Sequence, residues 1–245
     1  MEKRSVLILI VTVLLVAALV APTFALPISV SYSDPGSPSQ IASITVLENN
    51  GSVYSGGVYT GPYNLSVPGY DSAWMCFDAG TTVSSLPWTA LVADTATAAT
   101  YLGNDKANMI AYLANQWDGS TPSVKNRDIN LAMWEIMADY GKAGLDVNAD
   151  TFQTTTDVIF VGQLLKDAVA SLGDGTSYQA TFLLPGYFDG ERWLFDDTGT
   201  QPFVQPVPEP GTLLLLGSGL IGLGAWRRRS RRSAASPDYS RKIRE

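Results

Sequence analysis

The chain contains one cysteine and no histidine, and these two facts limit the chemistry that its side chains can perform. Without histidine, Ser-His-Asp and Cys-His nucleophilic catalysis are excluded, and the commonest ligand of zinc and copper is missing. The single cysteine, Cys76, has no partner for a disulfide within the chain. In an oxidising compartment its thiol must be buried, capped, paired with another molecule or used in a reaction.

Cys76 lies in an apolar segment, and a second segment with a related pattern follows later in the chain. Residues 74–78 read Trp-Met-Cys-Phe-Asp, and residues 129–135 read Ile-Asn-Leu-Ala-Met-Trp-Glu. The pair resembles the thioester domain of bacterial surface adhesins, in which an apolar-Cys-apolar strand faces a helix reading apolar-Gln-x-x-apolar-Trp. The resemblance implies a bond between the cysteine sulfur and a glutamine side-chain carbonyl, which forms with loss of ammonia. An amine or hydroxyl on a target surface would open it.

Asn130 stands where that pattern has glutamine, and its side chain is one methylene shorter. The amide carbonyl then lies more than about 1 Å further back, and such an error can cost about a hundredfold in a reaction that depends on near-attack geometry. Three interpretations of Cys76 are open: a bond to Asn130, a free redox-active or intermolecular thiol, and a small buried core residue. In the third, which the shorter side chain favours, Asn130 hydrogen-bonds to a neighbouring strand or loop.

A weaker pattern of oxygen ligands follows. Asp146, Asn148 and Asp150 alternate as at the start of an EF-hand calcium loop, and Asp157 would supply a later ligand. Thr151 stands where that loop requires glycine, and Asp157 where it requires the longer glutamate. The alternative is a turn that leads into the next helix and caps it.

Glu135 and Asp139 lie four residues apart, which places both carboxylates on one face of a helix. A pair of carboxylates is the catalytic arrangement of most glycoside hydrolases. Like charges at this spacing more often belong to a solvated face, and we favour that interpretation.

Hydrophobic periodicity predicts an α+β domain with β strands at both ends and a central three-helix segment. Strands are predicted at residues 41–47, 53–59, 73–78, 178–184 and 192–195, with glycine-rich turns between several of them. Apolar spacings of three and four predict two helices that end near residues 117 and 140, with Asn104 and Asn126 as N-caps, and a third helix over residues 157–171.

Aromatic residues are frequent in the first β part of the chain: Tyr54, Tyr59, Tyr63, Tyr70, Trp74 and Trp88. Such side chains can stack against sugars. They serve equally well as core and edge residues of a β sandwich, and we favour this second role.

Three consecutive segments of different character make up the C-terminal part of the chain. Pro208, Glu209 and Pro210 precede an apolar segment, residues 212–226, which ends at Arg227, Arg228 and Arg229. This layout resembles the PEP-CTERM sorting signal of Gram-negative bacteria. The resemblance implies insertion into the membrane, processing by an exosortase near Pro-Glu-Pro, and release or transfer of the upstream part to the cell surface. The alternative is an ordinary C-terminal anchor with its arginines in the cytoplasm.

The N-terminal residues have the pattern of a signal peptide. A basic start is followed by the apolar run 6–20, and Thr23-Phe24-Ala25 places small residues where a signal peptidase reads them. We expect cleavage after Ala25, and the alternative is an uncleaved N-terminal anchor.

The sequence thus divides into five parts: a signal peptide (1–25), an exported domain (26–195), a linker (196–206), the sorting signal (207–232) and a polar tail (233–245). Residues 26–210 contain 6 Lys and Arg against 20 Asp and Glu, a net charge of −14. Nucleic acid is therefore not an expected partner, because phosphate backbones bind clustered cations. No cofactor is expected.

Three classes of function follow. The first is a non-enzymatic protein of the cell surface or extracellular matrix, which meets signal peptidase, an exosortase and the membrane during export and associates with extracellular polysaccharide afterwards. The second is a covalent adhesin in which Cys76 and Asn130 form an internal thioester that reacts with a surface amine or hydroxyl. The third is a secreted carbohydrate-active enzyme that uses Glu135 and Asp139.

Overall fold

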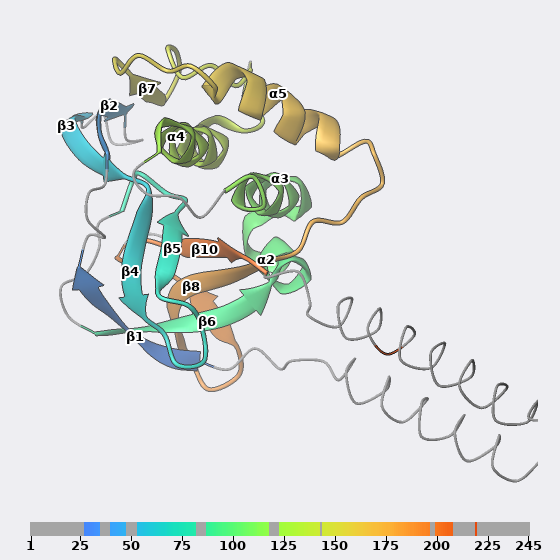
Figure 1. Ribbon diagram of the computed structural model, residues 1–245. Coiled ribbons are helices and arrows are strands. Elements are labelled where there is room, and N and C mark those ends of the chain that lie inside the picture. Colours follow the sequence, from blue (N-terminus) through green and yellow to red (C-terminus); the bar gives the residue numbers. More distant parts are fainter. Residues whose placement is uncertain are drawn as a thin grey trace, which may run out of the picture. The chain divides into compact units, whose positions relative to one another are not determined.

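The computed structural model describes residues 27–34, 40–47, 53–81, 87–117, 123–142, 144–196, 199–207 and residue 219. Within these residues the chain forms ten strands and four helices (Figure 1). The description below concerns the compact unit that ends at Pro206.

Six antiparallel strands close into a barrel. Their order around it is β1 (Pro27–Asp34), β4 (Pro62–Ser66), β5 (Ala73–Cys76), β10 (Phe203–Pro206), β8 (Ala180–Phe188) and β6 (Trp88–Asp94), which pairs with β1 again. The short strand β10 completes the ring because it pairs with β5 on one side and with β8 on the other. A further strand, β9 (Trp193–Phe195), extends β8 as a hairpin.

A second, smaller sheet has the order β3 (Val53–Thr60), β2 (Gln40–Leu47) and β7 (Phe152–Thr154). Strand β2 forms because its apolar residues alternate: Ala42, Ile44 and Val46 are buried, and the residues between them are more exposed. The buried side chains join one apolar core with those of the helices and the barrel.

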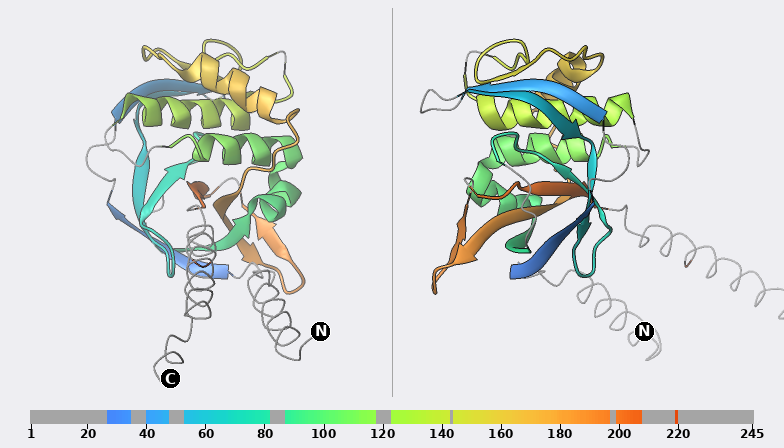
Figure 2. Two further views of the ribbon diagram at one scale, coloured as in Figure 1. Left: turned by 45° about the vertical axis from the view of Figure 1, so that its right-hand side comes forward. Right: turned by 90° about the vertical axis from the view of Figure 1, so that its left-hand side faces the viewer.

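Four helices lie between and beside the two sheets: α2 (Thr95–Leu102), α3 (Asn104–Ala114), α4 (Val124–Asp139) and α5 (Val161–Ser171). Helix α4 contacts α3 and α5 and also the small sheet, and 11 of its 16 residues are buried. Figures 1 and 2 show the helices on one side of the barrel, with the small sheet next to α4. Residues of α4 therefore reach the core of both sheets.

The predicted fold class, an α+β domain with strands at both ends and a central three-helix segment, is wrong. Strands from both halves of the chain form one closed barrel, four helices are present among the described residues, and β7 lies between α4 and α5. Helix α2 was missed because its sequence, TATAATYL, has no apolar stripe at helical spacing. Strand β7 has three residues, which is too short for alternation to be visible.

Several predicted boundaries also differ. Gly103 and Ser123 precede the two helices for which Asn104 and Asn126 were predicted as caps, and the Ser123 hydroxyl accepts a hydrogen bond from the Asn126 backbone N–H. Helix α5 begins at Val161, four residues after the predicted start. Residues 203–206, which the sequence assigned to a linker, form β10 and belong to the barrel.

Both termini lie almost wholly outside the described residues. This applies to the predicted signal peptide with Ala25, to Pro208, Glu209 and Pro210, to Arg227, Arg228 and Arg229, and to the polar tail; of residues 212–226, only Gly219 is described. In the described part of the chain, no helix combines the length and the apolar character needed to cross a membrane.

Candidate functional site

Cys76 is the last residue of β5 and lies opposite Phe203 of β10 in the barrel. Its side chain is fully buried. The thiol donates a hydrogen bond to the Asp78 carbonyl oxygen (3.3 Å), and its sulfur accepts one from Trp134 Nε1 (3.3 Å). Burial raises the pKa of the thiol to about 12, which favours the neutral thiol, the less nucleophilic form, at physiological pH.

Asn130 lies on the face of α4 that meets the barrel and is also fully buried. Its Oδ1 accepts a hydrogen bond from the Gly61 backbone N–H (2.8 Å), and its Nδ2 donates one to the Cys76 carbonyl oxygen. The amide thus connects the residue before β4 to the end of β5. We call Cys76, Asn130 and Trp134 the cysteine cluster.

The structure brings Cys76 and Asn130 together, as the sequence predicted, but joins them through the backbone of Cys76. A thioester would consume the Asn130 amide nitrogen, which here donates to the Cys76 carbonyl. The arrangement agrees with the interpretation of Cys76 as a small buried core residue, with Asn130 bonded to neighbouring strands.

Glu135 and Asp139 do not form a solvated face, because both side chains are fully buried. Glu135 Oε1 accepts a hydrogen bond from the Asp146 backbone N–H (2.6 Å), and Asp139 accepts bonds from the backbone N–H groups of Thr151 (3.1 Å) and Phe152 (2.8 Å). The two carboxylates therefore fix the loop before β7.

The pKa values of the two carboxyl groups are shifted in opposite directions. Burial, and then the charge of Asp139, raise the pKa of Glu135 to about 7, and its Oε2 has no hydrogen-bond partner among the described residues. Burial would also raise the pKa of Asp139, but hydrogen bonds from Lys142 Nζ and from the backbone of Phe152 and Thr151 hold it below its usual value. Asp139 is therefore ionised at neutral pH, and Glu135 is near its midpoint.

The predicted calcium loop is a turn. Asp146 Oδ1 accepts hydrogen bonds from the backbone N–H (3.0 Å) and side-chain amide (2.9 Å) of Asn148, and Asp150 adopts a left-handed conformation with φ 61°. Among the described residues, no three Asp, Glu, His or Cys side chains are grouped as metal ligands, so Asp146, Asp150 and Asp157 are not brought together. The hydrogen bonds of Asp146 agree with the alternative interpretation of this segment as a turn, and calcium binding stays a prediction.

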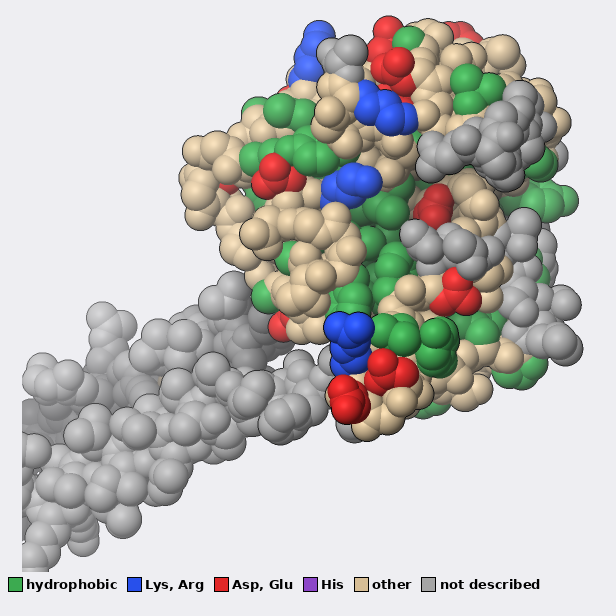
Figure 3. All heavy atoms as spheres, turned by 180° about the vertical axis from the view of Figure 1, so that it is seen from behind, with side chains coloured by type: hydrophobic (Ala, Val, Ile, Leu, Met, Phe, Trp, Pro, Cys, Tyr) green, Lys and Arg blue, Asp and Glu red, His purple; other side chains and the backbone are tan. Residues whose placement is uncertain are grey.

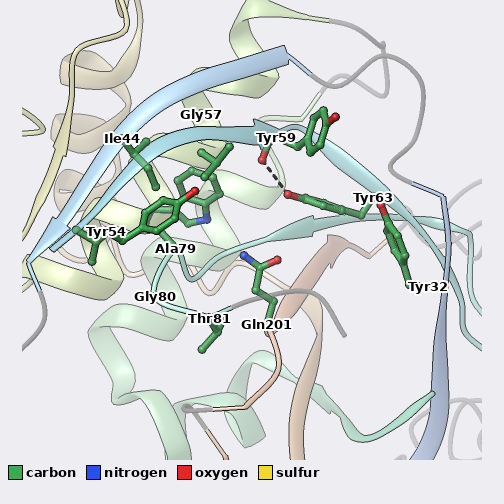
Figure 4. Close-up of a pocket in the computed structure, with 13 residues that line it drawn as sticks. Tyr32, Ile44, Tyr54, Gly57, Tyr59, Tyr63, Ala79, Gly80, Thr81 and Gln201 are labelled. Atoms are coloured by element: carbon green, nitrogen blue, oxygen red, sulfur yellow. Dashed lines mark hydrogen bonds between the residues drawn. The ribbon is translucent and has the colours of Figure 1, made fainter. Parts of the chain in front are cut away.

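A cleft of about 450 Å³ opens between the small sheet and the barrel. Tyr32, Tyr54, Tyr59, Tyr63 and Trp134 give it an aromatic lining, and none of its 13 lining residues is charged (Figure 4). Tyr54 and Tyr59 are 45 % and 50 % exposed, whereas Tyr63 is buried and donates a hydrogen bond to the Tyr59 carbonyl oxygen (2.8 Å). We call this the tyrosine cleft.

Two polar side chains of the tyrosine cleft were not predicted from the sequence. Thr81 Oγ1 and Gln201 Oε1 are buried and have no hydrogen-bond partner within the part of the chain that the structure describes. The Gln201 amide nitrogen donates to the Asp78 carbonyl oxygen (3.1 Å), which fixes the orientation of the side chain. Neither residue lies in a motif, so only the closure of the barrel could have placed them there.

A second cleft of about 730 Å³ shares Val46, Ala79, Gly80 and Trp134 with the tyrosine cleft. It also contains Lys106, whose Nζ donates a hydrogen bond to the Met137 carbonyl oxygen (2.9 Å). Burial lowers the pKa of this lysine. Figure 3 shows acidic and basic side chains scattered over the face opposite to that of Figure 1, around a central strip of hydrophobic ones.

Comparison with known proteins identifies the C-terminal segment. Residues 206–229 match the family model of the PEP-CTERM protein-sorting motif. No curated protein and no solved structure matches the chain. The resemblance to thioester domains therefore has no support from these comparisons. The sorting motif implies that the chain is exported, is anchored in the membrane by its C-terminal part before cleavage, and is sorted by an exosortase.

Proposed function

We propose that the chain is an exported, non-enzymatic protein of the cell surface or extracellular matrix of a Gram-negative bacterium, and that its barrel-and-helix domain is a binding module. The observation that carries this proposal is the match of the sorting motif, which begins at Pro206, the last residue of β10. The folded domain and the export signal are therefore contiguous in the sequence, and processing near Pro208 would leave the domain whole.

A role without catalysis is supported by the burial and hydrogen bonding of the candidate catalytic groups. The Cys76 thiol is buried and neutral. Glu135 and Asp139 hold the backbone of the loop before β7, and neither lines the tyrosine cleft or the cleft beside it. The burial of these groups, and their position outside both clefts, favour a role without catalysis.

A covalent adhesin is the second candidate, because Asn130 and Trp134 both hydrogen-bond to Cys76. Intact-mass measurement of protein recovered from the native cell, with and without methylamine, separates the two. We expect an unmodified mass with one thiol in both samples. An ammonia-sized deficit that methylamine converts into an adduct would establish the covalent candidate, and the Cys76→Ala variant is the control that must lack it.

Sorting is tested by replacing Pro208, Glu209 and Pro210 together with alanine in the full chain. We expect the variant to accumulate in the membrane with its C-terminal segment attached, while a matched control, Pro237→Ala in the polar tail, is processed normally. Equal processing of both variants would contradict sorting through the motif. Recovery of the intact chain from the cytoplasm would contradict export.

A further inference from the structure

We propose that the tyrosine cleft binds a neutral saccharide. This inference rests on the proposed function as a surface binding module and names the chemical class of the ligand. It is carried by three features of the cleft: its aromatic walls, its unpartnered polar atoms and its lack of charge.

The aromatic walls face each other across an open space. Figure 4 shows Tyr54 on one side, Tyr59 and Tyr63 on the other, and the amide of Gln201 pointing into the space between them. Tyr54 and Tyr59 are about half exposed, so their rings are available to a ligand. A sugar ring offers a flat apolar face of C–H groups, which packs against an aromatic face as other apolar groups do. The volume of about 450 Å³ lies within the usual range of small-ligand sites.

Two buried polar side chains, Thr81 and Gln201, belong to the lining of the cleft. Thr81 and Gln201 are 6 % and 7 % exposed, and neither Thr81 Oγ1 nor Gln201 Oε1 has a hydrogen-bond partner among the described residues. Buried polar atoms in folded proteins are nearly always bonded. The threonine hydroxyl can donate or accept, and the glutamine oxygen accepts. Sugar hydroxyls do both, so one ring could bond both atoms while it stacks on a tyrosine.

The absence of charge among the described lining residues disfavours ionic ligands. None of the described lining residues is Lys, Arg, Asp or Glu, so an anion or a cation would lose its hydration without gaining an ionic partner among them. The exported segment also has a net charge of −14, which repels polyanions at long range. A neutral saccharide satisfies the hydrogen bonds without requiring a countercharge.

The test measures the binding of neutral oligosaccharides to protein recovered from the cell surface, first on an array. Cellohexaose, maltohexaose and mannohexaose are then measured individually by calorimetry, and trigalacturonate is the charged comparison. We expect binding of at least one neutral glycan and none of trigalacturonate. Tyr54→Ala should weaken binding at least about fivefold. Tyr187→Ala, at a 58 % exposed tyrosine outside the cleft, is the matched control and should change nothing.

Thr81→Val distinguishes a binding hydroxyl from a structural one. Because the hydroxyl is buried without a partner among the described residues, its replacement by a methyl group should raise the melting temperature while it weakens saccharide binding about tenfold. A lower melting temperature, or unchanged binding, would overturn the assignment of Thr81.

The two proposals can fail separately. If no neutral glycan binds while processing and export depend on the sorting motif, the surface role stands and the saccharide assignment is overturned. If a neutral glycan binds and the mass shows the deficit that methylamine removes, the tyrosine cleft keeps its assignment and the non-covalent role is wrong. Binding that Tyr54→Ala leaves unchanged places the saccharide elsewhere and overturns the inference.

Discussion

The cysteine cluster and the tyrosine cleft share one side chain, that of Trp134. Trp134 donates its indole N–H to Cys76 Sγ and also lines the tyrosine cleft. In the cluster the thiol and both ends of the Asn130 amide are bonded, whereas in the cleft two buried polar atoms have no partner among the described residues. Cys76, which has the most reactive side chain of the two regions, is thus part of the core. The proposed binding site is the tyrosine cleft, where two buried polar atoms have no partner among the described residues.

Replacement of Trp134 should disrupt both the cysteine cluster and the tyrosine cleft, and we expect it to have the largest effect on stability. Its indole is 1 % exposed and packs edge-on against Phe152, with ring centroids 6.0 Å apart. We expect Trp134→Ala to lower the free energy of unfolding by about 3–5 kcal/mol, measured by urea denaturation. Trp134→Phe keeps most of the ring and loses the N–H, so it should be the milder variant. Equal losses for the two would mean that the hydrogen bond to the sulfur dominates.

Loss of the Asn130 amide tests the cluster alone. Asn130→Ala leaves the Gly61 N–H and the Cys76 carbonyl without their partner, and each buried unpaired group costs about 1–3 kcal/mol. We expect a loss of about 2–4 kcal/mol in the free energy of unfolding. The control Asn148→Ala, in an exposed turn, should stay within about 0.5 kcal/mol. Similar effects at the two positions would contradict the role of Asn130 as a connection between strands.

Glu135 tests whether every buried polar atom without a partner contributes to ligand binding. Its Oε2 has no partner among the described residues, but it lies outside the tyrosine cleft. Its folded pKa of about 7 exceeds the ordinary value of 4.5, so the folded state binds the proton more tightly. The resulting stability is complete below pH 4.5 and is lost as the pH rises through about 7. Glu135→Gln should match the wild type in acid and exceed its free energy of unfolding by up to about 3 kcal/mol at pH 8, at roughly 1.4 kcal/mol per pKa unit.

Two controls accompany the Glu135 experiment. Asp139 has a lowered pKa, so its contribution is present at neutral pH and is lost as the pH falls, and Asp139→Asn should destabilise the protein mainly at neutral pH. Saccharide binding by Glu135→Gln should equal that of the wild type. Weaker binding would show that Glu135 Oε2 affects ligand binding in the tyrosine cleft.

Cys76→Ala should have the smallest effect. The change removes two weak hydrogen bonds, one that the thiol donates and one that its sulfur accepts, and leaves a small void, so we expect a loss of about 1 kcal/mol in the free energy of unfolding. A companion measurement follows the reaction of the wild-type thiol with a disulfide reagent at pH 8, which should be slow in the folded protein and fast in urea. Rapid labelling of the folded protein would contradict a buried, neutral thiol.

Local sequence patterns predicted some of these features and not others. The alternation in β2 and β3 and the apolar spacing in α4 were visible because each pattern lies within one element. The proximity of Cys76 and Asn130 was predicted from a resemblance that the comparisons do not support, although the structure places the two residues together. The closure of the barrel could not be predicted, because the partners of β10 depend on pairings across more than a hundred residues.

The tyrosine cleft was beyond prediction for the same reason. Tyr54 and Tyr59 belong to β3, whereas Gln201 lies two residues before the start of β10. Their assembly into one site depends on tertiary structure, and polar atoms without partners leave no signal in a sequence. Tyr63, one of the aromatic residues predicted as core or edge residues, is buried and also lines the cleft.

The position of β10 at the carboxyl end of the domain determines when the barrel can form during secretion. A chain that crosses the membrane with its amino end first presents β5 and β8 before the strand that joins them. During this interval both strands have free edges, which are templates for pairing with another molecule. Cys76 lies at one of these edges, so disulfide-linked dimers should arise from incompletely translocated chains and not from the mature protein.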